Sequence, residues 1–247
     1  MTAHVPPPTL VGIGVGPGDP ELLTVKAIRH LRAASVVLVP ETEESDGKAG
    51  RAETVVLDAV PEARIQRIPF SMRDRSGVTQ RRKQAWLTSA EAALAAFRDG
   101  ASSVAFATVG DPSVYSTFSY LAGHVREELP EVAIEVVPGI TAMQALAATS
   151  RTPLVEGKET LALVPATAGD DHLREILGVV STVVAYKGGR RLPEIAELAK
   201  SVGREGVVGI QMGMEGERIL ALDEAEPGPY FTTVLLPAPR KSIGGGL

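Results

Sequence analysis

Three turns rich in glycine and proline carry the residue types best suited to hold a small ligand through the backbone. They are residues 12–21 (GIGVGPGDPE), 109–117 (VGDPSVYST) and 136–142 (VVPGITA), and each directly follows or ends an apolar run. Because glycine has no Cβ, a ligand can approach such a backbone closely. The first turn departs from the dinucleotide pattern G-x-G-x-x-G, since Asp19 replaces the third glycine and Pro17 lacks an amide donor. We therefore expect a ligand that these turns grip without holding its phosphates, which disfavours a nicotinamide dehydrogenase.

The elements that must position these turns are expected to be parallel strands of one sheet. Near-continuous apolar strands separated by helical patterns are typical of a parallel sheet that is covered on both faces. The predicted strands are 10–15, 36–39, 64–70, 103–107 and 132–137. The predicted helices begin at Pro20 and span 79–98, 115–129 and 140–149, whereas 41–51, after Pro40, is expected to be a mobile loop. One such turn alone is an ordinary strand-to-helix connection, but three at the carboxyl edge of one sheet favour a ligand site.

A second α/β unit is predicted after a linker at 151–157. Its helices are expected at 170–177 and 192–202, and its strands at 160–164, 182–186, 207–212, 218–222 and 230–236. The last three strands follow one another without a helix, which predicts a mixed sheet. The fold class is therefore α/β, with an N-terminal α/β domain over 9–150 and a C-terminal α/β domain over 151–240.

Composition excludes several classes of protein. The 247 residues contain no cysteine, which rules out disulfides, thiolate catalysis and cysteine-bound metals. The four histidines lack the spacing of metal ligands, so we expect no metal. The net charge of −5 disfavours a general nucleic-acid binder. We find no secretory signal and no run near the ~18 apolar residues of a membrane span, so a cytoplasmic protein without a membrane partner is expected.

The three turns, in this order and spacing, resemble the tetrapyrrole (corrin and sirohaem) methyltransferases, a class of S-adenosylmethionine enzymes without a Rossmann fold. The resemblance runs from about Leu10 to about Pro237. Within it, the segments 110–121 (GDPSVYSTFSYL), 138–141 (PGIT), 154–157 (LVEG) and 164–166 (VPA) are similar to the branch that methylates C20 of precorrin-2. The resemblance implies two α/β domains with S-adenosylmethionine kinked into the cleft between them, S-adenosylhomocysteine as product, and no metal. It also implies a homodimer that acts on precorrin-2 in cobalamin biosynthesis.

The resemblance also implies which residues contact the cofactor. From the first half of the chain they are Pro17, Gly110, Asp111, Val114, Tyr115, Ser116, Thr141 and Ala142, and from the second half Lys187 and Gly213. No catalytic base is carried over, because Pro40 stands where several relatives have an acidic residue. Glu41, Glu43 or Glu44, solvent, or the substrate itself could accept the proton.

Cations are expected to hold the substrate, because precorrin-2 carries eight carboxylates. Arginine suits carboxylates through its bidentate fork. The candidates are Lys48, Arg51, Arg73, Arg190 and Arg191. A single charge of this kind is more often a solvated surface residue, although the run from Lys187 to Arg191 at a predicted strand end favours binding.

Several alternatives stay open at this point. A sister enzyme could act on another precorrin, on uroporphyrinogen or on the cobalt-containing form of the substrate. A more distant relative that methylates a diphthamide precursor or ribosomal RNA is less favoured, the RNA option because of the acidic balance and the few aromatic residues. A binding module for an adenosyl ligand, without catalysis, is the alternative from a different class.

Overall fold

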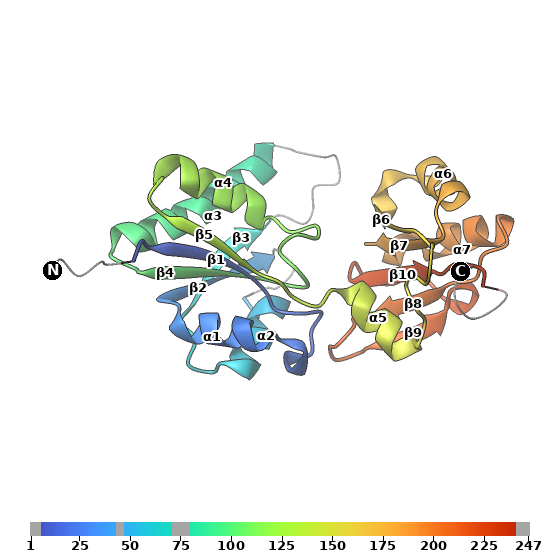
Figure 1. The fold of residues 1–247 in the computed structure, drawn as a ribbon, viewed down its shortest axis with the longest axis horizontal. Coiled ribbons are helices and arrows are strands. Elements are labelled where there is room, and N and C mark those ends of the chain that lie inside the picture. The colour runs from blue at the N-terminus through green and yellow to red at the C-terminus, as the bar shows by residue number, and fades with distance from the viewer. Residues whose placement is uncertain (1–5, 43–46, 71–79, 241–247) are drawn as a thin grey trace. The chain divides into compact units, whose positions relative to one another are not determined.

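The computed structural model describes residues 6–42, 47–70 and 80–240. Its contacts divide the chain into two compact units, Met1–Thr141 and Ala142–Leu247 (Figure 1). The division falls before the domain boundary at residue 150 that the sequence suggests, and that boundary stays a prediction. None of the helices in the described ranges combines the length and apolar character that crossing a membrane requires.

The first unit is a parallel sheet covered by helices on both faces. Its strands are β1 (Thr9–Gly14), β2 (Val36–Thr42), β3 (Ile65–Phe70), β4 (Ser103–Thr108) and β5 (Ala133–Val137), and their order in the sheet is β3-β2-β4-β1-β5. Every pair is parallel, as predicted. A parallel sheet of this kind brings the turns after β1, β4 and β5 to the same edge.

Alternation along the strands sorts the buried side chains of the first unit between its two faces. Val11 and Ile13 of β1 share a core with α1 (Val25–Ala33) and α2 (Arg51–Ala59). Leu10 of the same strand shares the other core with α3 (Gln80–Arg98) and α4 (Phe118–Glu128). Figure 1 shows these two helix pairs on opposite sides of the sheet. The strands are thus fixed from both faces, which holds the turns at their ends.

Three local expectations were wrong in this unit. Pro20 begins only a short 3₁₀ turn (Pro20–Leu22), and α1 starts later because the Thr24 hydroxyl caps it by accepting from the Ala27 amide. Helix α2 occupies residues that were not predicted to be helical. Strand β2 continues through Pro40, because its pairing with β4 stops at Leu38 and the missing amide there costs the sheet no hydrogen bond on that side.

The second unit contains the predicted mixed sheet. Its strands are β6 (Leu161–Pro165), β7 (Thr182–Tyr186), β8 (Val207–Ile210), β9 (Arg218–Ala221) and β10 (Thr232–Leu236), in the order β6-β7-β10-β8-β9. β6 and β7 are parallel, whereas β10 runs antiparallel to β7 and β8. Helices α6 (Asp170–Val179) and α7 (Leu192–Ser201) share one core with the sheet. Helix α5 (Ala142–Ser150) packs on β8 and β10.

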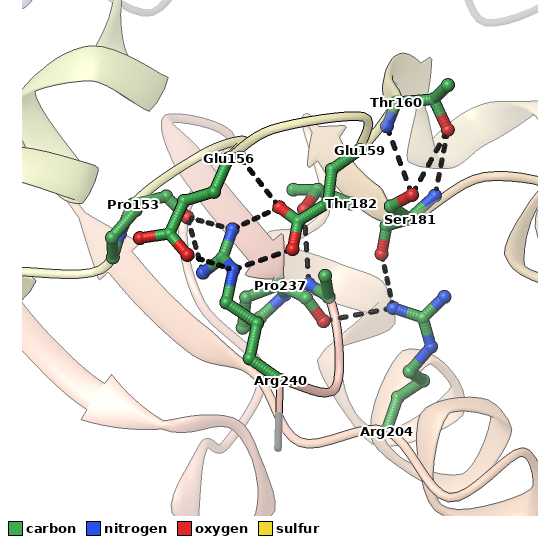
Figure 2. A network of polar contacts seen from close by, with 10 residues as sticks. Pro153, Glu156, Glu159, Thr160, Ser181, Thr182, Arg204, Pro237 and Arg240 are labelled. Atoms are coloured by element: carbon green, nitrogen blue, oxygen red, sulfur yellow. Dashed lines mark hydrogen bonds and ion pairs between the residues drawn. The ribbon is translucent and has the colours of Figure 1, made fainter. Parts of the chain in front are cut away.

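Two arginines hold the connections of the second unit (Figure 2). Arg240 donates from Nε and Nη2 to the two carboxylate oxygens of Glu159, at 2.8 and 2.5 Å, and from both Nη atoms to the Pro153 carbonyl at 3.2 Å. Arg204 donates to the carbonyls of Ser181 and Pro237, at 2.5 and 2.9 Å. Arg240, at the end of the described residues, therefore anchors Pro153 in the segment expected to be a linker and Glu159 just beyond it.

Candidate functional site

The turns after β1 and β4 are joined by paired backbone hydrogen bonds. The Gly110 amide donates to the Gly16 carbonyl at 2.7 Å, and the Gly16 amide donates to the Gly110 carbonyl at 3.4 Å. Both glycines have positive φ, 76° at Gly16 and 74° at Gly110, a conformation that other residues rarely adopt. Glycine is therefore favoured at both positions, because it adopts this conformation without strain.

The turn after β5 reaches the same place through close backbone contact. A Cβ built on Gly139 would lie 2.2 Å from the Gly110 carbonyl oxygen and 2.7 Å from the Gly14 Cα. A Cβ on Gly14 would lie 2.5 Å from the same oxygen. Side chains cannot be accommodated at such distances, so the three turns meet only because these residues are glycines. We call Gly14, Gly16, Gly110 and Gly139 the glycine junction.

One carboxylate links two of the turns by hydrogen bonds. Asp111 Oδ2 accepts from the Gly139 amide at 2.9 Å, and Oδ1 accepts from the Ser113 amide at 2.7 Å and from the Ser113 hydroxyl. Only 8% of Asp111 is exposed. Burial by itself raises the pKa of Asp111, but the hydrogen bonds from Ser113 and Gly139 outweigh it and hold the pKa below its usual value. Asp111 is thus a buried, ionised group next to the junction.

The other residues predicted in the first unit surround the junction to different degrees. Pro17 follows Gly16 and is buried, and Thr141 is buried two residues after Gly139. Tyr115 is 46% exposed and has φ 51°. The hydroxyl of Ser116 accepts from the Phe118 amide at 3.2 Å and donates to the Thr108 hydroxyl, so it serves the start of α4. Val114 completes a turn by donating its amide to the Asp111 carbonyl.

The junction combines open backbone at one glycine with several oxygen acceptors. A Cβ on Gly110 would meet only the Thr141 Cα, at 3.9 Å, so space remains beside this glycine. The groups gathered there are glycine and proline backbone, a buried hydroxyl and an ionised carboxylate. Oxygen acceptors of this kind tolerate a positive charge, and the missing Cβ of Gly110 leaves room close to the backbone.

In the second unit, two predicted residues lie just beyond strand ends. Lys187 follows β7, has φ 62°, and places its Nζ 5.6 Å from the centroid of the Tyr230 ring. The Gly213 amide donates to Glu217 Oε2 at 2.5 Å. Gln211, directly after β8, also has a positive φ of 53°. Ala142 is the first residue of α5.

The predicted substrate cations differ in how they are engaged. Arg191 donates to the Ala166 carbonyl at 2.5 Å and pairs with Asp170, so it stabilises its own unit. Arg190 and Lys48 are exposed. Arg51 is half-buried at the start of α2, and burial lowers its pKa. Arg73 lies outside the described residues, as do Glu43 and Glu44 among the proton-acceptor candidates.

Two features of the site went unnoticed in the sequence analysis. Arg67 of β3 binds both oxygens of the buried Glu53, at 2.8 and 3.0 Å, and lies 3.5 Å from Glu41, which raises the pKa of Arg67. No local signal identifies this pairing. The contact role of Gly14 and Gly139 was also missed, although glycines at alternate positions of one strand, 12 and 14, were a usable signal. A Cβ on Gly12 would lie 2.6 Å from the Phe118 ring.

Within the ranges that the structure describes, no group of three or more His, Asp or Glu side chains is placed to hold a metal ion.

Comparison with known proteins identifies relatives over most of the chain. Residues 9–227 match the family model of the Tetrapyrrole (Corrin/Porphyrin) Methylases. A precorrin-2 C(20)-methyltransferase of Sinorhizobium sp is 31% identical over 237 residues, which cover 92% of this chain and 94% of the relative. A probable cobalt-precorrin-2 C(20)-methyltransferase of Methanocaldococcus jannaschii is 37% identical over 177 residues, which cover 71% and 70%.

Solved structures of similar fold include a uroporphyrin-III C-methyl transferase from Thermus thermophilus in complex with S-adenosyl homocysteine. It is 25% identical, covers 92% of this chain and 96% of its own, and has a TM-score of 0.65. A cobalt precorrin-4 methyltransferase has a TM-score of 0.68 at 22% identity and covers 93% of this chain and 94% of its own. Both agree with the two α/β units described above.

Proposed function

Because this chain belongs to the tetrapyrrole (corrin/porphyrin) methylases, which use S-adenosylmethionine, we propose that it methylates C20 of precorrin-2 in cobalamin biosynthesis. The coarser activity, that of a tetrapyrrole C-methyltransferase, follows from the family. The choice of position is supported by relatives named as precorrin-2 or cobalt-precorrin-2 C(20)-methyltransferases. A uroporphyrinogen-III C-methyltransferase also matches, at 32% identity over 75% of this chain, so the position is a proposal.

The observation that carries the proposal is the glycine junction with Asp111 beside it. We propose that Pro17, Gly110, Val114 and Thr141 hold the cofactor there. S-adenosylmethionine, when bound, supplies an electrophilic methyl group on a sulfonium. Methyl transfer to carbon needs alignment of the reacting atoms rather than an enzyme nucleophile. A junction in which three turns touch through their backbones is suited to this, because it has little freedom to rearrange.

The residues that hold the substrate and accept its proton stay predictions. Arg51, Arg190 and Lys48 are candidates for the carboxylates, whereas Arg191 is occupied by Asp170 and Ala166. Glu41, at the end of β2, is held 3.5 Å from Arg67 and is a candidate proton acceptor. Tyr115, Ser116, Ala142, Lys187 and Gly213 also stay candidates for the cofactor, and a homodimer stays the expected assembly.

The experiment is methylation of defined substrates, followed by product mass. The chain is incubated with S-adenosylmethionine and, separately, with metal-free precorrin-2, cobalt-precorrin-2 and uroporphyrinogen III. We expect one added methyl group on a precorrin-2, located at C20 by NMR. Methylation of uroporphyrinogen alone would instead assign a sister activity. Binding of S-adenosylhomocysteine without methylation of any of the three would contradict the proposed reaction.

A further inference from the structure

We propose that Asp111 is a positioning residue, whose carboxylate sets the spacing between the turns after β4 and β5 instead of bonding to the cofactor. The inference rests on the proposed function, because it takes the glycine junction to be the cofactor site. Asp111 would then hold the backbone of the residues that contact the cofactor, without being a ligand of the cofactor itself.

The contacts of the carboxylate support this role. Its two oxygens accept three hydrogen bonds, two from Ser113 in its own turn and one from the Gly139 amide, which lies 28 residues further along the chain. A buried carboxylate is costly unless such donors satisfy it. Asp111 is only 8% exposed, and both of its oxygens are engaged by these donors.

The bond to Gly139 acts on the residue that makes the closest contact of the junction. Gly139 is the position whose Cβ would lie 2.2 Å from the Gly110 oxygen. The same turn continues to Thr141, whose Cα lies 3.9 Å from the Cβ position of Gly110. By holding Gly139, Asp111 therefore fixes the distance between Gly110 and Thr141, two of the residues expected to contact the cofactor.

The test is Asp111→Asn, with Asp99→Asn as its matched control. Asparagine has nearly the same size, but it replaces one acceptor oxygen with an NH₂ group, so a Ser113 or Gly139 donor faces another donor. Asp99 is exposed at the end of α3, before β4. Two quantities are measured on the full chain: hydrogen–deuterium exchange of residues 137–142 without ligand, and the affinities for S-adenosylmethionine and S-adenosylhomocysteine by calorimetry.

We expect Asp111→Asn to speed exchange at 137–142 and to weaken both ligands by the same factor, about tenfold. Asp99→Asn is expected to change neither quantity. The equal factor matters because only S-adenosylmethionine carries the sulfonium charge, so a direct charge contact would weaken it more than the product. Unchanged exchange in Asp111→Asn, or a loss confined to S-adenosylmethionine, would overturn the positioning role.

A second variant covers the case in which Asp111→Asn does not fold. Asp111→Glu keeps the charge but moves the carboxylate outward by one methylene, so it cannot serve both turns. The same faster exchange and equal loss of affinity are expected, and retained affinity would overturn the inference. A wild-type chain that binds neither ligand would contradict the proposed function instead, whatever the exchange experiment shows.

Discussion

The two units fix the loops at their strand ends by different means, although the second also has a bare backbone contact at Gly189, where a Cβ would lie 1.9 Å from the Pro229 carbonyl oxygen. In the first, the turns after β1, β4 and β5 touch through bare glycine backbone, with one carboxylate between them. In the second, the guanidinium groups of Arg204 and Arg240 reach over longer gaps to carbonyls and carboxylates. Backbone contact leaves no room for adjustment, whereas a long side chain can be shortened or replaced at a moderate cost. The junction is therefore expected to tolerate substitution less well than the arginine contacts of the second unit.

The largest effect is expected where backbone meets backbone. Gly139→Ala places a methyl group 2.2 Å from the Gly110 oxygen, so the turns must separate. We expect a loss of about 3 kcal/mol in the free energy of unfolding, measured with urea, together with loss of cofactor binding. Gly123→Ala on α4 is the control, because a Cβ there meets nothing within 4 Å. Near-normal stability of Gly139→Ala would break the comparison.

The next effect concerns the arginine of the second unit that serves several carbonyls. Arg204 donates to Ser181, Pro237, Val180 and, at 3.4 Å, Leu177. Arg204→Ala should cost about 2 kcal/mol of unfolding free energy, because partly buried carbonyls lose their donor. Arg204→Lys should recover part of this, since one ammonium cannot serve all four. If the lysine variant were as unstable as the alanine variant, the tolerance attributed to side-chain braces would be contradicted.

A smaller, pH-dependent effect on stability is expected at the ion pair between Arg240 and Glu159. The hydrogen bond from Arg240 lowers the pKa of Glu159. A carboxylate with a lowered folded-state pKa adds stability that is present above its unfolded pKa and is lost as the pH falls through the folded value. We expect the urea concentration at the unfolding midpoint of the wild type to decrease as the pH is lowered below about 4.3, the ordinary pKa of glutamate. The decrease is expected to be less steep in Glu159→Gln. If the midpoints of the two proteins decreased equally steeply with falling pH, the Arg240–Glu159 pair would not contribute to the pH dependence of stability.

The smallest effect is expected at glycines whose Cβ would contact no neighbouring atom. Gly178 lies inside α6, and a Cβ there meets nothing within 4 Å. Gly178→Ala should raise the free energy of unfolding by about 0.5–1 kcal/mol, because alanine favours the helix. Gly123→Ala is expected to give a gain of the same size in the first unit. If either variant had a lower free energy of unfolding in urea, the cost of replacing a glycine would not depend on how close its Cβ lies to neighbouring atoms.

Sequence patterns predicted the strands and both sheet types because an apolar run and its flanking residues are adjacent in the sequence. Residues 182–186, for example, were predicted as a strand and form β7. The same patterns placed three turns at one edge, where the structure brings them into contact. They missed α2, which begins after Gly50 without a side-chain cap. They also could not pair Asp111 with Gly139 or Arg67 with Glu53, since these contacts join residues that only the folded chain brings together.

The place of β10 in the second sheet sets the order in which this half of the protein can be completed. It is the last strand among the residues that the structure describes, yet it lies between β7 and β8 and is buried at every residue. During synthesis, the sheet has to wait for residues 232–236 to leave the ribosome, with the facing edges of β7 and β8 unpaired until they arrive. The first sheet has all its strands by residue 137, so the nascent chain can fold in one half while the other is still vulnerable to aggregation.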